Sequence, residues 1–343
     1  MIWLTWRQFR TQAAVVFAAL AALAAVLALT GPSLAHDYAT GIAACTPHGG
    51  CSTFTEQFFN DHQTLYFALV AVVMFVPALI GLFWGAPLIT RELEAGTHRL
   101  VWNQSITRTR WLAVKLALTG LAAMAAAGLG SLAVTWWSSP IDKAGFSRFP
   151  RLSPLLFDAR GIAPIGYAAF AFALGVTIGM LIRRTLPAMA ITLTAFAVIQ
   201  IAMPLLIRPH LIAPVRLTTA ITATNLNSFL IQSHNNPPVH VTVRVPDPGA
   251  WVLSNQTINA AGHVVSGVAV SLDTGPCALA APPLPPFSPA CFAEISQLGY
   301  RQQVAYQPTS RFWAFQWYET AIFITLALGL AGFCFWWIRR RLT

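Results

Sequence analysis

Six long apolar runs, separated by polar segments, dominate the hydropathy pattern of the chain. Each run has around 20 residues, the helical length that crosses about 30 Å of hydrocarbon. The pattern therefore predicts six transmembrane helices, and six crossings place both termini on one side of the membrane. The runs cover roughly residues 12–30, 64–86, 113–137, 162–182, 186–207 and 314–338.

A long polar segment, residues 208–313, separates the fifth run from the sixth. Within it, VHVTVRV at 239–245 alternates between apolar and polar positions, as a strand does, and HVVSGVAVSL at 263–272 is a second candidate strand. We therefore expect a small β-containing domain here. It divides the chain into residues 1–207, with the first five helices, and residues 314–343, with the sixth helix and a basic tail.

The composition agrees with a membrane protein. Of the 343 residues, 56% are hydrophobic and 9% are charged, and the mean hydropathy is +0.61. A soluble domain carries about 25% charged residues. The net charge of +10 invites a nucleic-acid function, but the basic residues form short clusters beside apolar runs. That distribution fits membrane topology better. We predict an all-α polytopic membrane protein with no nucleic-acid partner.

The basic residues also set the orientation. With both termini in the cytoplasm, twelve of the 21 basic residues lie inside, on short segments. The other nine lie on much longer outside segments, and long loops translocate largely regardless of charge. Four of these nine, in the loop at 138–161, weaken the assignment. The twelve inside residues are Arg7, Arg10, Arg91, Arg99, Arg108, Arg110, Lys115, Arg183, Arg184, Arg339, Arg340 and Arg341.

The N-terminal residues 1–11, MIWLTWRQFRT, read as a short amphipathic helix at the membrane surface. Trp3, Trp6 and Arg7 are expected to anchor it at the level of the lipid headgroups. The alternative is the basic start of a cleavable signal peptide, but the apolar run that follows is long for one.

Residues 87–115 hold five basic residues together with Glu92 and Glu94. Polar groups avoid lipid, so the segment leaves the membrane, and its basic excess places it in the cytoplasm. A short helix at 88–95, ended by Gly96, would present a docking surface to a soluble partner. The alternative is a solvated loop.

Further along this segment, Arg108 and Trp111 are expected to act as interface anchors rather than as contacts to the partner.

Four cysteines lie in the segments assigned to the outside. An oxidising compartment favours disulfides, and four cysteines allow three connectivities. We favour Cys45 with Cys51 and Cys277 with Cys291, whereas Cys334 lies within the sixth run. A metal site is the competing idea, but no ligand pair has zinc-type spacing. The outside histidines are His36, His48, His62, His210, His234, His240 and His263.

The apolar runs carry no Asp, Glu, His or Lys near their middle; Glu319 and Lys115 lie close to run ends. Carriers driven by ion gradients usually place ionisable groups at mid-membrane. The absence of such groups argues against such a carrier and against an intramembrane acid–base enzyme. A phosphate-binding loop needs Gly-Lys followed by Ser or Thr, and neither Lys115 nor Lys143 has these neighbours. A separate subunit would have to bind ATP.

The charged segment contains the pattern E-x-x-x-G-T at Glu92, Gly96 and Thr97, followed by Leu100, by SITR at 105–108 and by Lys115. Here the chain resembles the permease subunits of type-2 ABC (ABC-2) exporters, in which a cytoplasmic coupling helix joins the second and third spans. The segment QPTSRFWAFQWYET at 307–320 resembles the one before the last span in actinobacterial relatives. The long 208–313 segment departs from the pattern of many such exporters.

The resemblance implies a multi-pass subunit of a bacterial cell membrane that is not itself an enzyme and binds no cofactor or metal. Two ATPase subunits carrying ATP and Mg would dock below a pair of permease protomers, a homodimer or a heterodimer. A hydrophobic or amphipathic substrate would leave between the protomers. The residues implied in coupling to the ATPase are Glu92, Glu94, Gly96, Thr97 and Leu100. The alternative is a membrane scaffold or sensor that binds an extracellular ligand through residues 208–313.

Overall fold

The computed structural model describes residues 2–48, 50–96, 107–145, 149–231, 238–278 and 288–340. The chain is mostly helical and divides into two compact units. Unit 1 comprises Met1–Phe149, Ser153–Leu211 and Trp313–Thr343, and unit 2 comprises Pro150–Leu152 and Ile212–Phe312.

Among the described residues, six helices are long and apolar enough to cross a membrane, which confirms the six predicted spans. These helices cover Phe9–Cys45, Ser52–Glu94, Arg108–Trp137, Ala163–Ile182, Thr185–Leu211 and Thr309–Arg340.

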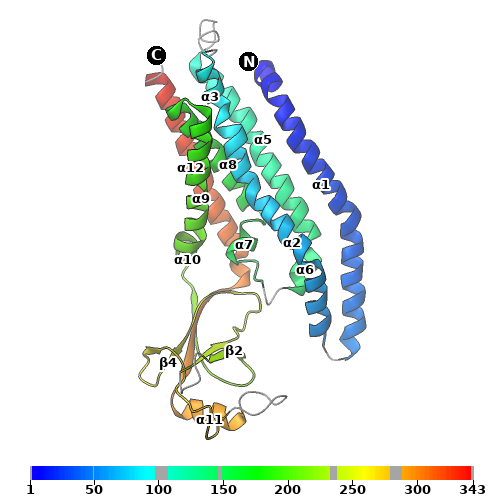
Figure 1. Ribbon diagram of the computed structural model, residues 1–343, viewed down its shortest axis with the longest axis vertical. Helices are drawn as coiled ribbons and strands as arrows, with labels where there is room; N and C mark the ends of the chain where they lie inside the picture. Colours follow the sequence, from blue (N-terminus) through cyan, green and yellow to red (C-terminus); the bar gives the residue numbers. More distant parts are fainter. Residues whose placement is uncertain are drawn as a thin grey trace. The chain divides into compact units, whose positions relative to one another are not determined.

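Unit 1 is a bundle of long helices (Figure 1). Its elements are α1 (Ile2–Cys45), η1 (Thr46–His48), α2 (Ser52–Ile80), the π-helical turn η2 (Gly81–Gly85), α3 (Pro87–Glu94), α5 (Arg108–Trp137), α6 (Ser139–Ala144), α7 (Pro154–Phe157), α8 (Ala163–Ile182), α9 (Thr185–Ala202), the π-helical turn η3 (Met203–Ile207), α10 (Arg208–Leu211) and α12 (Phe312–Arg340), which follows the 3-10 turn η4 (Thr309–Arg311).

Helix α1 differs from the prediction at both ends. Residues 2–11 do not form a separate surface helix, because α1 runs unbroken from Ile2 to Cys45. Between the first two predicted spans, residues 31–45 continue α1 and residues 52–63 begin α2. At 1.5 Å per residue α1 is roughly 66 Å long, about twice the hydrocarbon thickness. Together with the start of α2, it therefore forms a helical hairpin that extends beyond the membrane.

Aromatic packing holds this hairpin together. The rings of Tyr38 on α1 and Phe58 on α2 meet edge to face, with centroids 5.4 Å apart. Gly41 leaves room for the ring of Phe54, whose Cζ lies 2.0 Å from where a Cβ would stand. The hydropathy pattern carries no sign of these contacts.

Helices α2 and α3 form one continuous helix through the wider turn η2. The N–H of Ala86 bonds to the carbonyl of Gly81 at 2.9 Å, five residues back. The glycines of this turn also let α8 approach closely. A Cβ on Gly175 of α8 would lie 2.5 Å from the carbonyl oxygen of Gly81, and one on Gly85 would lie 2.6 Å from that of Phe172. Small residues at such crossings bring helix backbones into direct contact.

Unit 2 contains strands β1 (Val215–Ala220), β2 (Leu226–Ile231), β3 (Val239–Val243), β4 (Trp251–Ile258), β5 (Val264–Val265) and β6 (Arg301–Gln307) and helix α11 (Pro289–Gln297). In the described part of unit 2, an antiparallel sheet has the order β1-β6-β4-β5, and β2 pairs with β3 in a hairpin.

Its core is built from alternate residues of β3, Val239, Val241 and Val243, together with Val304 and the disulfide between Cys277 and Cys291. The strand predicted at 239–245 is β3. The one predicted at 263–272 is reduced to β5 and a single bridge from Val268 to Val239.

Candidate functional site

The residues predicted to couple the chain to an ATPase lie at and beyond the end of α3. Ile89 and Thr90 face the core of unit 1, whereas Arg91 and Glu94 are exposed. Gly96 has φ +67°, the left-handed conformation that commonly follows a helix end. Thr97 and Leu100, which complete the predicted coupling set, lie outside the described residues.

Glu92 links α3 to α5. Its Oε1 accepts a hydrogen bond from Nζ of Lys115, and the side chains of Lys115 and Glu92 are only 5% and 15% exposed. The Lys115 ammonium also lies 4.9 Å from the ring centroid of Trp111. An ion pair removed from water in this way fixes the geometry of the two helices more firmly than a surface pair would.

Glu94 links α3 to α9. Its Oε1 accepts a hydrogen bond from the backbone N–H of Thr185 at 2.9 Å, and its Oε2 accepts one from the Thr185 hydroxyl at 2.6 Å. Thr185 is the first residue of α9, so the Glu94 carboxylate caps an N-terminus, where unpaired N–H groups and the helix dipole favour negative charge.

Both predicted coupling acids therefore bind other helices of the same chain. The sequence analysis expected them on a docking surface, and it had no means of finding Lys115 and Thr185 as their partners. Helix α3 is therefore connected to α2 through η2, to α5 through Glu92 and to α9 through Glu94.

The first turns of α1 lie beside this site. A groove of about 280 Å³ is lined by Thr5, Phe9 and Gln12 of α1, by η2 and α3, and by Lys115. Phe9 meets Trp84 edge to face, with ring centroids 4.7 Å apart. The first turns of α1, predicted as a separate surface helix, are thus packed against η2 and α3.

Of the predicted interface anchors, Trp3 and Trp6 are 68% and 51% exposed, and the Arg7 guanidinium lies 5.4 Å from the Trp3 ring centroid. Trp111 does not fit that role, because it is 3% exposed and packs in the core. Arg108 begins α5, which is capped by the Thr107 side chain.

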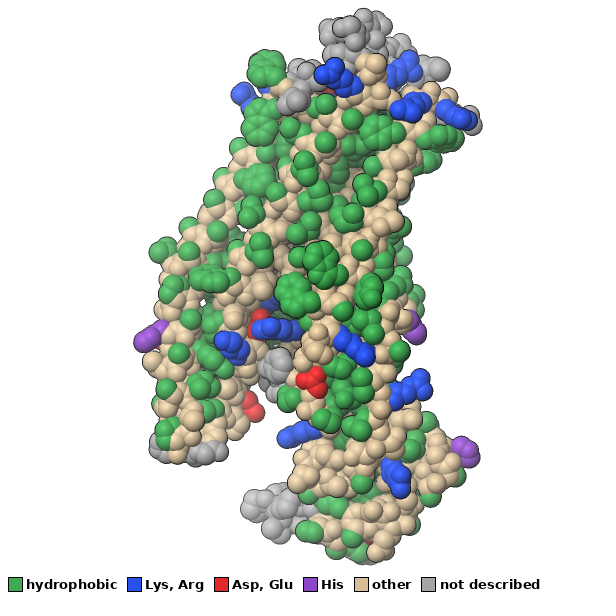
Figure 2. Space-filling model, turned by 180° about the vertical axis from the view of Figure 1, so that it is seen from behind, with side chains coloured by type: hydrophobic (Ala, Val, Ile, Leu, Met, Phe, Trp, Pro, Cys, Tyr) green, Lys and Arg blue, Asp and Glu red, His purple; other side chains and the backbone are tan. Residues whose placement is uncertain are grey.

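Exposed basic side chains surround the α3 end of unit 1, by which we mean the end that carries α3, the start of α1 and the end of α12. Figure 2 shows Lys and Arg gathered at this end, beyond a band of apolar side chains. Apart from Glu92 and Glu94, the charged residues described at this end are basic. The exposed basic residues are Arg7, Arg10, Arg91, Arg110, Arg183, Arg184, Arg339 and Arg340.

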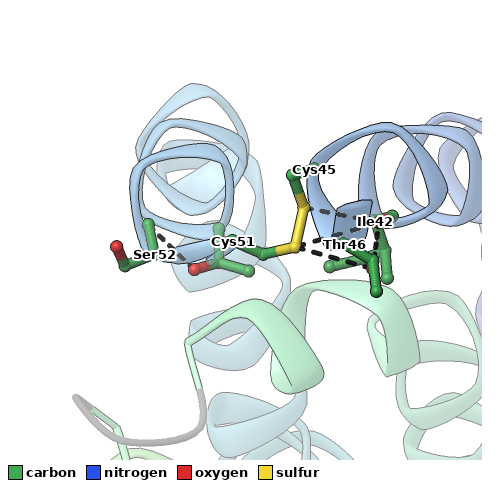
Figure 3. The surroundings of a disulfide bond; sticks show 6 residues. Ile42, Cys45, Thr46, Cys51 and Ser52 are labelled. Atoms are coloured by element: carbon green, nitrogen blue, oxygen red, sulfur yellow. Dashed lines mark hydrogen bonds between the residues drawn. A yellow bond between two sulfur atoms is a disulfide. The ribbon is translucent and has the colours of Figure 1, made fainter. Parts of the chain in front are cut away.

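The opposite end of the α1–α2 hairpin is closed by a disulfide between Cys45 and Cys51, with Cα atoms 5.3 Å apart (Figure 3). In unit 2, Cys277 and Cys291 are joined, with Cα atoms 4.5 Å apart. These are the two pairings that the sequence analysis favours. Among the described residues, no group of three or more His, Cys, Asp or Glu side chains could hold a metal.

The sequence analysis missed a buried ionic cluster, which lies before the start of α8 and after the end of α9. Arg208 is fully buried, and its Nε and Nη2 donate to the two oxygens of Glu319 at 2.8 and 2.9 Å. Nη2 also donates to Asp158. Arg208 lies just past the fifth predicted span, at the start of the predicted outside domain, so the absence of Asp, Glu, His and Lys from the spans gave no sign of it. The signal in the sequence was the position of opposite charges, with Arg208 just after the fifth run and Glu319 near the start of the sixth.

A second buried ion pair lies nearby. Arg160 donates from Nη2 to Asp142 at 3.3 Å and from Nη1 to the Val134 carbonyl at 3.0 Å, while the Tyr66 hydroxyl donates to Asp142 at 2.6 Å. Arg160 and Arg208 are two of the nine basic residues assigned to the outside. Because both are paired with buried carboxylates, they weigh less against that orientation than free loop charges would.

Comparison with protein-family models matches residues 17–208 to the family described as ABC-2 membrane transporter related. The matched region is more than half of the chain and includes α3, Lys115 and Thr185. No functionally described protein and no solved structure is significantly similar to the chain. Six apolar helices and this match together show a multi-pass membrane protein, the membrane component of an ABC transporter rather than its ATPase. The chain belongs to the ABC-2 membrane transporter related family.

Proposed function

We propose that this chain is the permease subunit of an ATP-driven exporter, which moves a hydrophobic or amphipathic substrate with ATP and Mg bound by a separate ABC ATPase. Family membership supports the ATPase partnership. The observation that carries the mechanism is the position of α3, which is linked to α5 through Glu92 and to α9 through Glu94.

In this mechanism, two ATPase subunits dock at the α3 end and push on α3 when they close around ATP. A short helix that ended in a free loop would dissipate such a push. Here α3 continues α2, and buried or capping carboxylates join it to α5 and α9, so these helices move together. A buried ion pair holds its geometry because separating the charges leaves each of them uncompensated.

The orientation that this function requires places the α3 end in the cytoplasm. The exposed basic residues at that end support it, because cytoplasmic segments carry an excess of Lys and Arg. The disulfide of the α1–α2 hairpin would then face an oxidising compartment, where such bonds persist.

A second permease protomer completes the proposed complex. Helices α1 and α9 expose large apolar side chains, among them Leu29, Val198 and Ile201. Contiguous apolar surfaces of this kind face lipid or another protein. We propose that the substrate path lies between protomers along these helices.

The test is coexpression with a candidate ABC ATPase subunit from the same genome, followed by copurification and measurement of ATP hydrolysis. We expect Glu92→Ala and Glu94→Ala to weaken the association or the hydrolysis that the permease stimulates. The control is Glu56→Ala, an exposed carboxylate near the far end of the hairpin, which should change neither. If both α3 variants behave like the control, the coupling assignment is wrong.

A sensor or scaffold is the second candidate. It is favoured by unit 2, which has its own apolar core and its own disulfide, as a ligand-binding domain would. A sensor would keep its ligand affinity in the Glu92→Ala variant and would not stimulate ATP hydrolysis, so the same coexpression experiment separates the two functions.

A further inference from the structure

The cluster around Arg208 has an unequal number of opposite charges. It consists of the Arg208 guanidinium, the carboxyls of Asp158 and Glu319, the Tyr167 hydroxyl and the Gln200 amide. Asp158 is 4% exposed, Tyr167 is 1% exposed, and Arg208 and Glu319 are fully buried. With both carboxyls ionised, these described groups carry one net negative charge away from water. An uncompensated charge is strongly disfavoured away from water, so such sites take up a proton instead.

The hydrogen bonds of Tyr167 also require one additional proton in the cluster. The Tyr167 oxygen lies 2.5 Å from Oε1 of Glu319 and 3.1 Å from Oδ1 of Asp158. A tyrosine hydroxyl has a single proton to donate, and an ionised carboxylate can only accept. The tyrosine proton can serve only one of these two contacts. Both are hydrogen bonds only if one of the two carboxyls is protonated and donates to the tyrosine oxygen.

Nη2 of Arg208 donates to the same Oδ1 of Asp158 and lies 3.5 Å from the Tyr167 oxygen, so the guanidinium and the tyrosine hydroxyl both lie between the two carboxyls. Oδ2 of Asp158 accepts from Nε2 of Gln200 at 3.2 Å, and the guanidinium of Arg208 lies over the Phe157 ring at 4.1 Å. The nearest other basic side chain on the same segment, Arg160, is paired with Asp142. Burial raises the pKa of Asp158 to about 6, although Arg208 opposes the shift.

The local fold explains why these groups meet. The π-helical turn η3, which contains Pro204, adds one residue per turn just before Arg208 and aims its side chain into the bundle. Arg208 lies three residues before unit 1 ends at Leu211, and Glu319 lies six residues after the chain returns at Trp313. Their pairing therefore joins the two helices that connect unit 1 to unit 2.

We propose that Asp158, Tyr167 and Glu319 form a proton-binding site, in which one proton is shared by the two carboxyls and neutralises the excess charge beside Arg208. The proton is taken from water and returned to it, and no other bond forms or breaks. Coupled carboxyls of this kind share their proton as a pair. After its release, Asp158 competes with Glu319 for the guanidinium, so the link between α10 and α12 depends on pH. The inference does not require the proposed direction of transport.

Infrared spectroscopy of the purified full-length chain in detergent micelles tests the proposal. Below pH 6 the wild-type spectrum should contain the carbonyl stretch of a buried, protonated carboxylic acid, and this band should be lost as the pH is raised well above 6. Absence of the band from the wild-type protein overturns the proposal without any variant.

Variants assign the band. Asp158→Asn should abolish it, and so should Glu319→Gln, because a single carboxylate then balances Arg208. The matched control is Asp142→Asn, which removes the other buried aspartate, paired one to one with Arg160, and should leave the band unchanged. A band that survives Asp158→Asn, or that disappears in Asp142→Asn, contradicts the assignment.

Stability gives a second reading that does not rely on the spectrum. A carboxyl whose pKa rises from about 3.9 in the unfolded chain to about 6 in the native protein stabilises fully below the lower value, and its contribution is lost as the pH rises through the higher one. The unfolding temperature of the wild type should therefore fall over this range relative to that of Asp158→Asn. Parallel curves for the two proteins would count against a shared proton.

Discussion

The pair formed by Glu92 and Lys115 can be tested by a double-mutant cycle. The changes are Glu92→Met, Lys115→Met and the two together, because methionine keeps much of the volume of both side chains and removes their charge. Each single change leaves the other charge in a site where the side chains are only 5% and 15% exposed. Breaking a buried pair in this way costs about 3–5 kcal/mol, while replacing both partners with apolar residues is often nearly neutral.

Because Glu92 is partly exposed, the expected cost of each single change lies below that range, at about 2–3 kcal/mol. With the double variant within about 1 kcal/mol of wild type, the coupling free energy is about 3 kcal/mol or more. Denaturant unfolding in detergent micelles, followed by far-ultraviolet circular dichroism, measures all four proteins.

The matched control cycle uses Glu56→Met and Arg110→Met, two exposed residues on different helices. Their effects should add to within about 0.5 kcal/mol. If the Glu92 and Lys115 changes add in the same way, α3 is not linked to α5 through this pair, and the proposed transmission fails at its first step.

Three further predictions concern packing and charge. Gly175→Leu should lower the unfolding temperature in detergent sharply, because its side chain would start 2.5 Å from the Gly81 carbonyl, whereas Gly329→Ala, with open space around it, should have little effect. Arg208→Met should destabilise the protein by about 3–5 kcal/mol in denaturant unfolding, since it leaves two carboxyls buried together, and a change below about 1 kcal/mol would mean that water already screens them. Replacing Cys277 and Cys291 with serine should lower the free energy of unfolding by about 3 kcal/mol and speed proteolysis of unit 2. The corresponding loss for the shorter loop between Cys45 and Cys51 should be about 2 kcal/mol. Equal protease resistance with and without the Cys277–Cys291 bond would contradict this.

Hydropathy alone predicts the six spans because a helix in lipid must be apolar along about 20 residues, and that requirement is written in composition. It fails for the hairpin beyond the membrane. There, the helical state of residues 31–45 and 52–63 depends on contacts such as Tyr38 with Phe58, and a polar helix outside lipid leaves no long apolar run. The same limit hides the π-helical turn η2, whose glycines are packed against α8.

The candidate site was predictable in position and not in detail. The pattern of charges around Glu92 indicated a segment that leaves the membrane between two spans, because charged groups avoid lipid. The partners of Glu92 and Glu94 lie 23 and 91 residues away in sequence, and those of Arg208 include Glu319, 111 residues away. Pairings at such separations are set by tertiary packing, and no local pattern reports them.

The central claim is that the α3 end faces the cytoplasm, where an ATPase can act on it. Thiol labelling in intact cells tests this with Ala95→Cys, at the exposed end of α3, and Thr40→Cys, exposed on the α1–α2 hairpin. The native background is low, because Cys334 is buried and the other cysteines of the chain are paired.

A reagent that cannot cross the membrane should label Thr40→Cys in intact cells and should label Ala95→Cys only after the membrane is opened. Labelling of Ala95→Cys from outside intact cells would contradict the account.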